Sequence, residues 1–238
     1  MIKKGIILFA VCLVAITSHA QYAYEQHDSK GKKSILSAIG IAGGITYGKD
    51  QWNPEGPYAQ ERDLLGFNGA VLVEFFHHPV YRWRVEAEYN QLGSTELLYV
   101  PAGQKTIDRT NYISLNNYLK IVFRKEGFVP YLLIGPRIEY LINEHAGVYP
   151  DVIGSFYRFH VSGAIGVGAE MTWNNPIRPF IEAFYHHDLM DSYYLNGNAI
   201  YTPTDISYRG YELRIGLKYF FVGLRKDECP KVINPAGN

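Results

Sequence analysis

The sequence contains very little cysteine, and no long apolar run follows its first 20 residues. Only Cys12 and Cys229 are present among 238 residues. We expect the segment that holds Cys12 to be removed, so no intramolecular disulfide can form in the rest of the chain. A membrane-spanning helix needs about 18 or more consecutive apolar residues, and nothing after residue 20 offers them. Stability must therefore come from packing or from the closure of a sheet.

The chain also lacks an excess of charge of either sign. It has 23 basic and 23 acidic residues, and removal of residues 1–20, with Lys3 and Lys4 and no acid, leaves 21 and 23. A nucleic-acid-binding protein usually carries a basic patch or stripe, and this balance provides none. We therefore expect no nucleic-acid partner.

The N-terminus has the pattern of a signal peptide. Lys3 and Lys4 form a positively charged region, and residues 6–16 form an apolar stretch of suitable length. Ser18 and Ala20 supply the small residues that a signal peptidase requires, which predicts cleavage before Gln21. We expect residues 1–20 to be removed on export and the polar residues 21–33 to form a periplasmic leader.

Aromatic residues are abundant, with 20 Tyr, 12 Phe and 3 Trp. They occur in eight alternating segments between residues 34 and 221, joined by short and long connections in turn. The short connections fall near 77–80, 124–128 and 174–178, and the long ones near 49–65, 93–109, 143–157 and 190–208. This rhythm is typical of a transmembrane β-barrel with tight periplasmic turns and long outer loops. The predicted fold is an all-β, closed, antiparallel, eight-stranded, transmembrane up-and-down barrel over 34–221, with a short periplasmic tail at 222–238.

The strand pattern is clearest in residues 81–91. Apolar residues such as Trp83 and Val85 alternate there with charged residues such as Arg84 and Glu86. Because successive side chains of a strand point to opposite faces, all charges share one face and the apolar groups share the other. A soluble sheet has the same alternation in a single strand, so the recurrence in several strands favours the barrel.

Charged residues of both signs occupy the predicted inner faces. They are Glu74, Arg82, Arg84, Glu86, Glu88, Lys120, Arg137, Glu139, Glu170, Glu182, Glu212, Arg214 and Lys218. The signs nearly cancel, and an eight-stranded barrel has an interior only wide enough for its own side chains. The set therefore predicts a salt-bridged plug, with a conducting or binding role as the alternative.

Aromatic residues tend to end the apolar rows, as in the girdles at the two interfaces of a membrane. The predicted girdle residues are Tyr47, Phe67, Phe75, Trp83, Tyr89, Tyr140, Trp173, Tyr219 and Phe221. The expected surroundings are accordingly outer-membrane lipid and lipopolysaccharide, with an envelope protein partner possible through the four long loops.

Histidine pairs do not predict a metal site here. His186 and His187 are adjacent on a strand and point to opposite faces, so they cannot both bind one ion without a bend. His77 and His78 lie at a short turn, where polar residues are common. We expect neither a metal nor another cofactor.

A lipid-modifying hydrolase embedded in a barrel is one alternative. His187, Asp188, Asp191 and Ser192 lie at the expected outer end of the seventh strand. No spacing among them singles out a nucleophile and its base, so we expect no enzymatic activity. A second alternative is a soluble periplasmic barrel that binds a small apolar ligand, as lipocalins do, although its apolar rows should point inward.

Several strands resemble those of the PorT-like family of small outer-membrane β-barrel proteins of Gram-negative bacteria. The matching segments are VEAEYNQLGS at 85–94, YISLNNYLKIVFR at 112–124, VPYLLIGPRIEYL at 129–141, GAIGVGAEM at 163–171 and LRIGLKYFF at 213–221. The fourth strand departs from the family, because Asn116 and Asn117 stand near a position where members often have a proline. The resemblance implies an eight-stranded outer-membrane barrel and supplies no substrate or reaction. The expected role is structural or interactive, through the outer loops.

Overall fold

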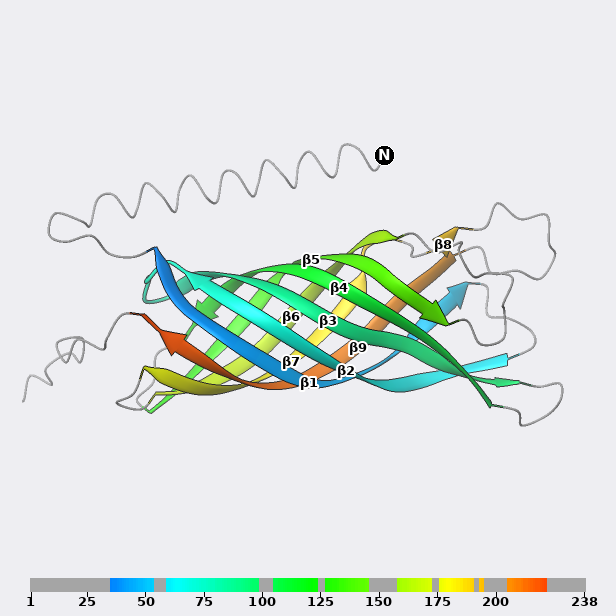
Figure 1. Cartoon of the computed structure of the whole chain (residues 1–238), viewed down its shortest axis with the longest axis horizontal. Helices are drawn as coiled ribbons and strands as arrows, with labels where there is room; N and C mark the ends of the chain where they lie inside the picture. Colours follow the sequence, from blue (N-terminus) through cyan, green and yellow to red (C-terminus); the bar gives the residue numbers. More distant parts are fainter. Residues whose placement is uncertain are drawn as a thin grey trace, which may run out of the picture. The chain divides into compact units, whose positions relative to one another are not determined.

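In a computed structural model, the described part of the chain forms a β-barrel. Figure 1 shows this barrel from the side. The structure describes residues 35–53, 59–98, 105–123, 127–145, 158–172, 176–190, 193–194 and 205–221. The predicted signal peptide, leader and tail lie outside these residues, as do parts of every predicted connection except the turn at 77–80. Among the described residues, no helix is long and apolar enough to cross a membrane.

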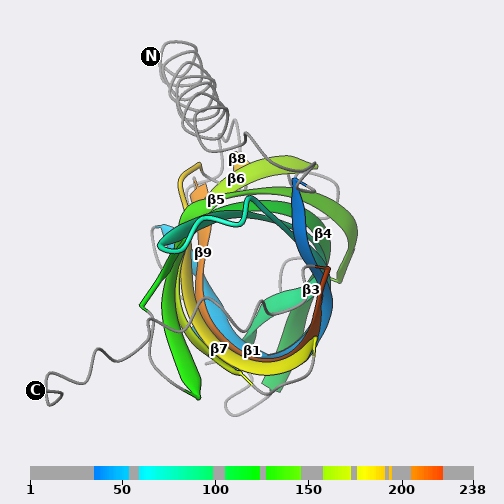
Figure 2. The same ribbon diagram turned by 90° about the vertical axis from the view of Figure 1, so that its left-hand side faces the viewer.

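Eight long strands and one two-residue strand make up the described sheet. They are β1 (Leu36–Asn53), β2 (Ala59–Phe75), β3 (Tyr81–Leu98), β4 (Lys105–Val122), β5 (Phe128–His145), β6 (Phe159–Met171), β7 (Ile177–Asp188), β8 (Tyr193–Tyr194) and β9 (Asp205–Phe220). Each long strand pairs antiparallel with the next, and β9 pairs with β1 to close the ring (Figure 2). The short β8 pairs with the start of β9, beyond the end of β7. The prediction of a closed, eight-stranded, antiparallel up-and-down barrel is confirmed.

The two ends of the barrel differ in their connections. Short connections join β2 to β3, β4 to β5 and β6 to β7 at one end, here called the turn end, where β1 begins and β9 stops (Figure 1). Gly127, in one of these turns, has a φ of 72°, a left-handed conformation that favours glycine. The longer connections lie at the opposite end, here called the loop end.

The strands at the loop end are longer than the sequence predicted. The first loop was expected at 49–65, yet β1 continues to Asn53 and β2 begins at Ala59. In the same way, β3 continues to Leu98 and β4 begins at Lys105, so both strands extend into the loop expected at 93–109. The prediction ended each strand where apolar alternation stopped. Backbone pairing needs no such alternation, because the ladder bonds join main-chain groups whatever side chains they carry.

Glycines make room for aromatic side chains inside the barrel. Gly216 lies directly opposite Phe180 in the β7–β9 pair, and a Cβ atom at 216 would overlap both the Phe180 ring and the Ile41 carbonyl oxygen. Gly168 similarly faces the ring of Tyr131. These glycines are therefore part of the interior packing.

Replacement of Gly216 by alanine should destabilise the barrel, because the new methyl group meets a ring and a fixed backbone oxygen. We expect the free energy of unfolding to fall by about 1–3 kcal/mol, the usual range for overpacking. Denaturant titration of the detergent-folded protein measures it. Gly69→Ala is the matched control, since its Cβ would come no closer than 3.9 Å to its nearest neighbour. Equal stability of the two variants would contradict the packing role.

Candidate functional site in the barrel interior

The predicted interior charges lie inside the barrel. Twelve of the thirteen are buried, and Arg82 is half-buried near the turn end. They come from seven of the eight long strands, because every second side chain of a strand points inward. Along the axis they form three groups of ion pairs.

The turn-end cluster consists of Glu74, Arg82, Lys120, Glu170, Arg178 and Lys218. The Nζ atom of Lys120 lies 2.9 Å from Glu74 and 3.2 Å from Glu170. Lys218 repeats this arrangement at 3.0 Å and 2.7 Å, so two lysines and two glutamates alternate around a ring. The guanidinium of Arg178 lies 4.2 Å from the ring centre of Phe220, toward the barrel end. The cluster holds four cations and two carboxylates.

The middle cluster is balanced. It consists of Arg84, Glu86, Glu182 and Arg214, and each arginine pairs with both glutamates. Glu182 is the most heavily bonded carboxylate of this cluster, because it also accepts a hydrogen bond of 2.5 Å from the Tyr131 hydroxyl. Removing it would leave two buried guanidinium groups short of a counter-charge.

The loop-end cluster contains more carboxylates than cations. It consists of Glu88, Arg137, Glu139, His160, His186, Asp188 and Glu212. The guanidinium nitrogens of Arg137 lie 3.5 Å from a carboxylate oxygen of Glu88, 3.1 Å from one of Glu139 and 2.6 Å from one of Glu212. Arg214 of the middle cluster reaches Glu88 at 3.6 Å and joins the two clusters.

Neutral polar groups extend this network. Asn116 donates a hydrogen bond of 2.5 Å to Glu88, and Asn90 donates one of 2.9 Å to Glu212. The Thr46 hydroxyl in turn donates a hydrogen bond of 2.8 Å to the Asn90 Oδ1 atom. Buried charges need this degree of satisfaction, because an unpaired one is expensive in a low dielectric.

Sequence reasoning missed several members of the clusters. Arg178, His186 and Asp188 are buried, yet none was in the predicted interior set. His160 is buried as well; the alternation places it on the polar face of its strand with Glu170, but the predicted set counted only acidic and basic residues. Counting every second residue from Glu182 along β7 reaches Arg178, His186 and Asp188. The prediction placed position 178 in a turn and position 188 at a loop rim, and therefore did not continue the count.

Apolar side chains fill the space between and beyond the charges. Tyr118, Leu133 and Phe184 belong to one buried group beside the middle cluster. The guanidinium of Arg214 lies 4.2 Å from the ring centre of Phe184. A second buried group covers the loop-end cluster and consists of Leu92, Tyr112, Leu141 and Tyr208. Over its described length the interior is packed with side chains.

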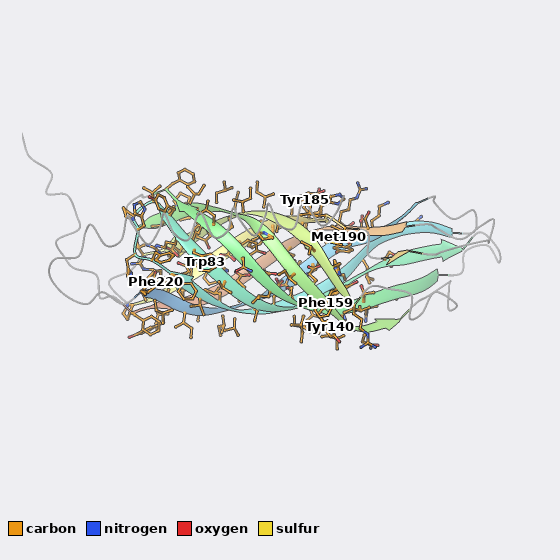
Figure 3. The ribbon with its side chains drawn as sticks, turned by 90° about the horizontal axis from the view of Figure 1, so that it is seen from above. Trp83, Tyr140, Phe159, Tyr185, Met190 and Phe220 are labelled. Carbon is orange, nitrogen blue, oxygen red and sulfur yellow. The ribbon has the colours of Figure 1, made fainter. Side chains whose placement is uncertain are left out.

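The predicted girdle aromatics that the structure describes lie on the outer surface, in two belts. Phe75, Trp83, Tyr219 and Phe221 lie toward the turn end, and Tyr47, Phe67, Tyr89 and Tyr140 lie toward the loop end. Trp173 lies outside the described residues. Figure 3 shows Trp83 in the turn-end belt and Tyr140, Phe159 and Tyr185 in the other. Exposed aliphatic residues fill the surface between the belts.

The residues weighed for hydrolytic chemistry do not share one face. His187 is exposed on the outside, whereas Asp188 is buried inside, and its Oδ2 atom accepts a hydrogen bond of 2.8 Å from the Tyr208 amide. Asp191 and Ser192 lie outside the described residues. At the turn end, His78 accepts backbone hydrogen bonds of 3.2 and 3.3 Å from Val80 and Tyr81. His78 therefore has a turn-forming role.

No protein-family model matches this sequence, so the resemblance to the PorT-like family stays a prediction. A comparison with curated proteins finds no match either.

Solved structures of small barrels are similar to this chain. The outer membrane protein OprG from Pseudomonas aeruginosa is 12% identical over 82% of this chain and 99% of its own, with a TM-score of 0.48. Neisserial surface protein A is 12% identical over 77% of this chain and 99% of its own, with a TM-score of 0.44. The outer membrane protein AlkL is 12% identical over 82% of this chain and 95% of its own, with a TM-score of 0.46. At these low scores the architecture rests on the strand pairs of this chain itself.

Replacement of Glu182 by leucine should strongly destabilise the barrel, because Arg84 and Arg214 both lose a carboxylate partner. We expect a loss of about 3–5 kcal/mol in the free energy of unfolding, the usual effect of breaking a buried pair. Denaturant titration in detergent measures it.

The matched control is the double variant Glu182→Leu with Arg84→Met, which restores the charge balance of the middle cluster. We expect it to be more stable than Glu182→Leu alone, since one uncompensated cation is removed. The coupling between Arg84 and Glu182 would be contradicted if the double variant lost as much free energy of unfolding as the two single variants added together.

Proposed function

We propose that this protein is a non-enzymatic outer-membrane β-barrel whose interior is a salt-bridged plug. In this proposal the barrel anchors the chain in the bilayer, surrounded by lipid and lipopolysaccharide. Its role is structural or interactive, through the loop end. The observation that carries the proposal is the distribution of polarity, with charges inside the barrel and apolar side chains outside.

The outer surface supports a lipid environment. Ile41, Ile181 and Ile215 are at least half exposed, and they lie between the two aromatic belts. The ten residue steps from Tyr211 to Phe221 correspond to about 24 Å along the axis, for a rise of about 3.4 Å and a strand tilt of about 45°. That height agrees with the apolar band of about 25 Å in outer-membrane barrels.

The same distribution argues against a soluble ligand-binding barrel. Such a barrel encloses its apolar ligand in an apolar cavity and presents polar residues to water. Here Arg84, Arg137 and Arg214 are fully buried, whereas Ile215 is 67% exposed. A contiguous exposed apolar surface of this extent is typical of contact with a membrane or a partner.

The packed interior also favours contacts at the outer end over transport. Ion pairs and buried rings occupy the lumen from Arg82 to Asp188, which leaves the long loops at 49–65, 93–109, 143–157 and 190–208 as the candidate contact region. We propose these loops as the surface for any envelope partner.

A charged residue in the middle of the outer belt should impair membrane folding in a depth-dependent way. We expect Ile215→Arg to lower the free energy of unfolding from liposomes by about 2–4 kcal/mol, and Tyr211→Arg, at the belt edge, to lower it by about 0–1 kcal/mol. Both positions are exposed on the same strand, so Tyr211→Arg is the matched control. Equal effects of the two substitutions would contradict a lipid-facing belt.

The plugged interior predicts that the protein does not form an open channel. We expect planar-bilayer recordings of the folded protein to show no large, stable conductance steps, because the lumen is filled by paired side chains. Insertion is verified separately by heat-modifiable mobility of protein recovered from the same membranes. Large and stable steps from inserted protein would overturn the plug while leaving the membrane location intact.

A further inference from the structure

Three potential metal ligands converge near the loop end of the interior. Glu139 on β5 and His160 on β6 are direct partners across their strand pair, and Asp188 on β7 pairs with Ser162, two residues along β6. His160 Nε2 lies 2.5 Å from Glu139 Oε2 and 3.7 Å from Asp188 Oδ1. One ligand atom from each residue lies within 4.8 Å of the others. All three side chains are buried.

The charge around these residues favours a cation. Four carboxylates gather in the loop-end cluster, namely Glu88, Glu139, Asp188 and Glu212. Arg137 contacts three of them, Arg214 of the middle cluster reaches Glu88 at 3.6 Å, and His186 lies 3.6 Å from Glu212. The four carboxylates therefore share two guanidinium groups, one of which also serves the middle cluster. The turn-end cluster has the opposite imbalance, with four cations and two carboxylates. An added divalent ion would offset the negative excess at the loop end.

The imidazole of His160 is buried between two of these carboxylates. Its Nε2 atom contacts Glu139 Oε2 at 2.5 Å, while among the described residues its Nδ1 atom makes no hydrogen bond. The other Glu139 oxygen, Oε1, lies 3.1 Å from Arg137 Nε. A divalent metal ion is a partner for both imidazole and carboxylate, and it would take the place of the direct contact between His160 and Glu139.

Neighbouring groups hold the ligands in place. The Tyr208 amide donates to Asp188 Oδ2, while Asp188 Oδ1 is the oxygen nearest His160. The Tyr112 ring packs edge-on against the His160 imidazole, with 4.8 Å between ring centres. Such surrounding contacts fix ligand orientation and raise metal affinity.

We propose that Glu139, His160 and Asp188 bind one divalent transition-metal ion, such as Zn²⁺, at the loop end of the interior. Donor atoms of a tetrahedral site lie about 3.3–3.6 Å apart for bond lengths of about 2.0–2.2 Å. The separation between His160 and Asp188 is already close to this value, and that between His160 and Glu139 must open by about 1 Å. The imidazole selects such an ion over Ca²⁺ and Mg²⁺, which prefer oxygen ligands alone.

The test is metal titration of the full chain, purified, folded in detergent and treated with a chelator. Co²⁺ is added first, because its visible absorption reports low-coordinate binding by nitrogen and oxygen, and Zn²⁺ is then used as the competitor in calorimetry. We expect one ion per chain, displaced by Zn²⁺ and not by equal concentrations of Ca²⁺ or Mg²⁺. Replacement by His160→Gln or Asp188→Asn should weaken binding at least about tenfold.

His187→Gln is the matched control, since His187 neighbours Asp188 on β7 but is exposed on the outside. We expect this variant to bind as the unaltered protein does. Heat-modifiable mobility verifies that each variant is folded, and Asp188→Asn decides the outcome if His160→Gln does not fold. The proposal is overturned if the unaltered protein shows no saturable binding, if a folded site variant binds equally well, or if Ca²⁺ competes equally.

Discussion

Buried charges of both signs are stable inside this barrel only while they are paired with one another. Arg84, Arg137 and Arg214 have no measurable exposure, and each lies within ion-pair distance of at least two carboxylates. Removing charges from water is expensive, and attraction between them compensates only when the geometry and hydrogen bonds are complete. The interior therefore requires all of its strands together, because partners such as Glu86 and Arg214 come from distant parts of the sequence.

Strand register follows from this constraint. A shift of one residue in any strand would turn its charges toward the apolar exterior and its apolar row toward the interior. Closure through the β1–β9 pair fixes the last register, and the glycines opposite Phe180 and Tyr131 allow the interior rings to fit beside the charges. The outer belts and the inner clusters are thus two results of the same alternation.

Charge is distributed unevenly along the axis of the interior. Cations predominate at the turn end, the middle cluster is balanced, and carboxylates predominate at the loop end. The proposed metal site lies where the negative excess is greatest, beneath the buried group formed by Leu92, Tyr112, Leu141 and Tyr208. A metal there would link β5, β6 and β7 below the loops through which we propose that the protein makes its contacts.

Alternation with a period of two is local information, and it was enough to predict the barrel, its eight long strands and the inward direction of residues such as Arg84 and Glu182. It also indicated the turn end, where short polar segments interrupt the strands. It did not determine how far the strands extend at the loop end, since backbone pairing there continues beyond the apolar rows.

Which charges meet inside the barrel depends on how its strands pair in three dimensions. Glu139, His160 and Asp188 are separated by 21 and 28 residues in the sequence, and no spacing rule links them. They converge because the register pairs Glu139 with His160 and Ser162 with Asp188 on adjacent strands. Register depends on the closure of the whole sheet, and so the site is a property of the closed barrel rather than of any single strand.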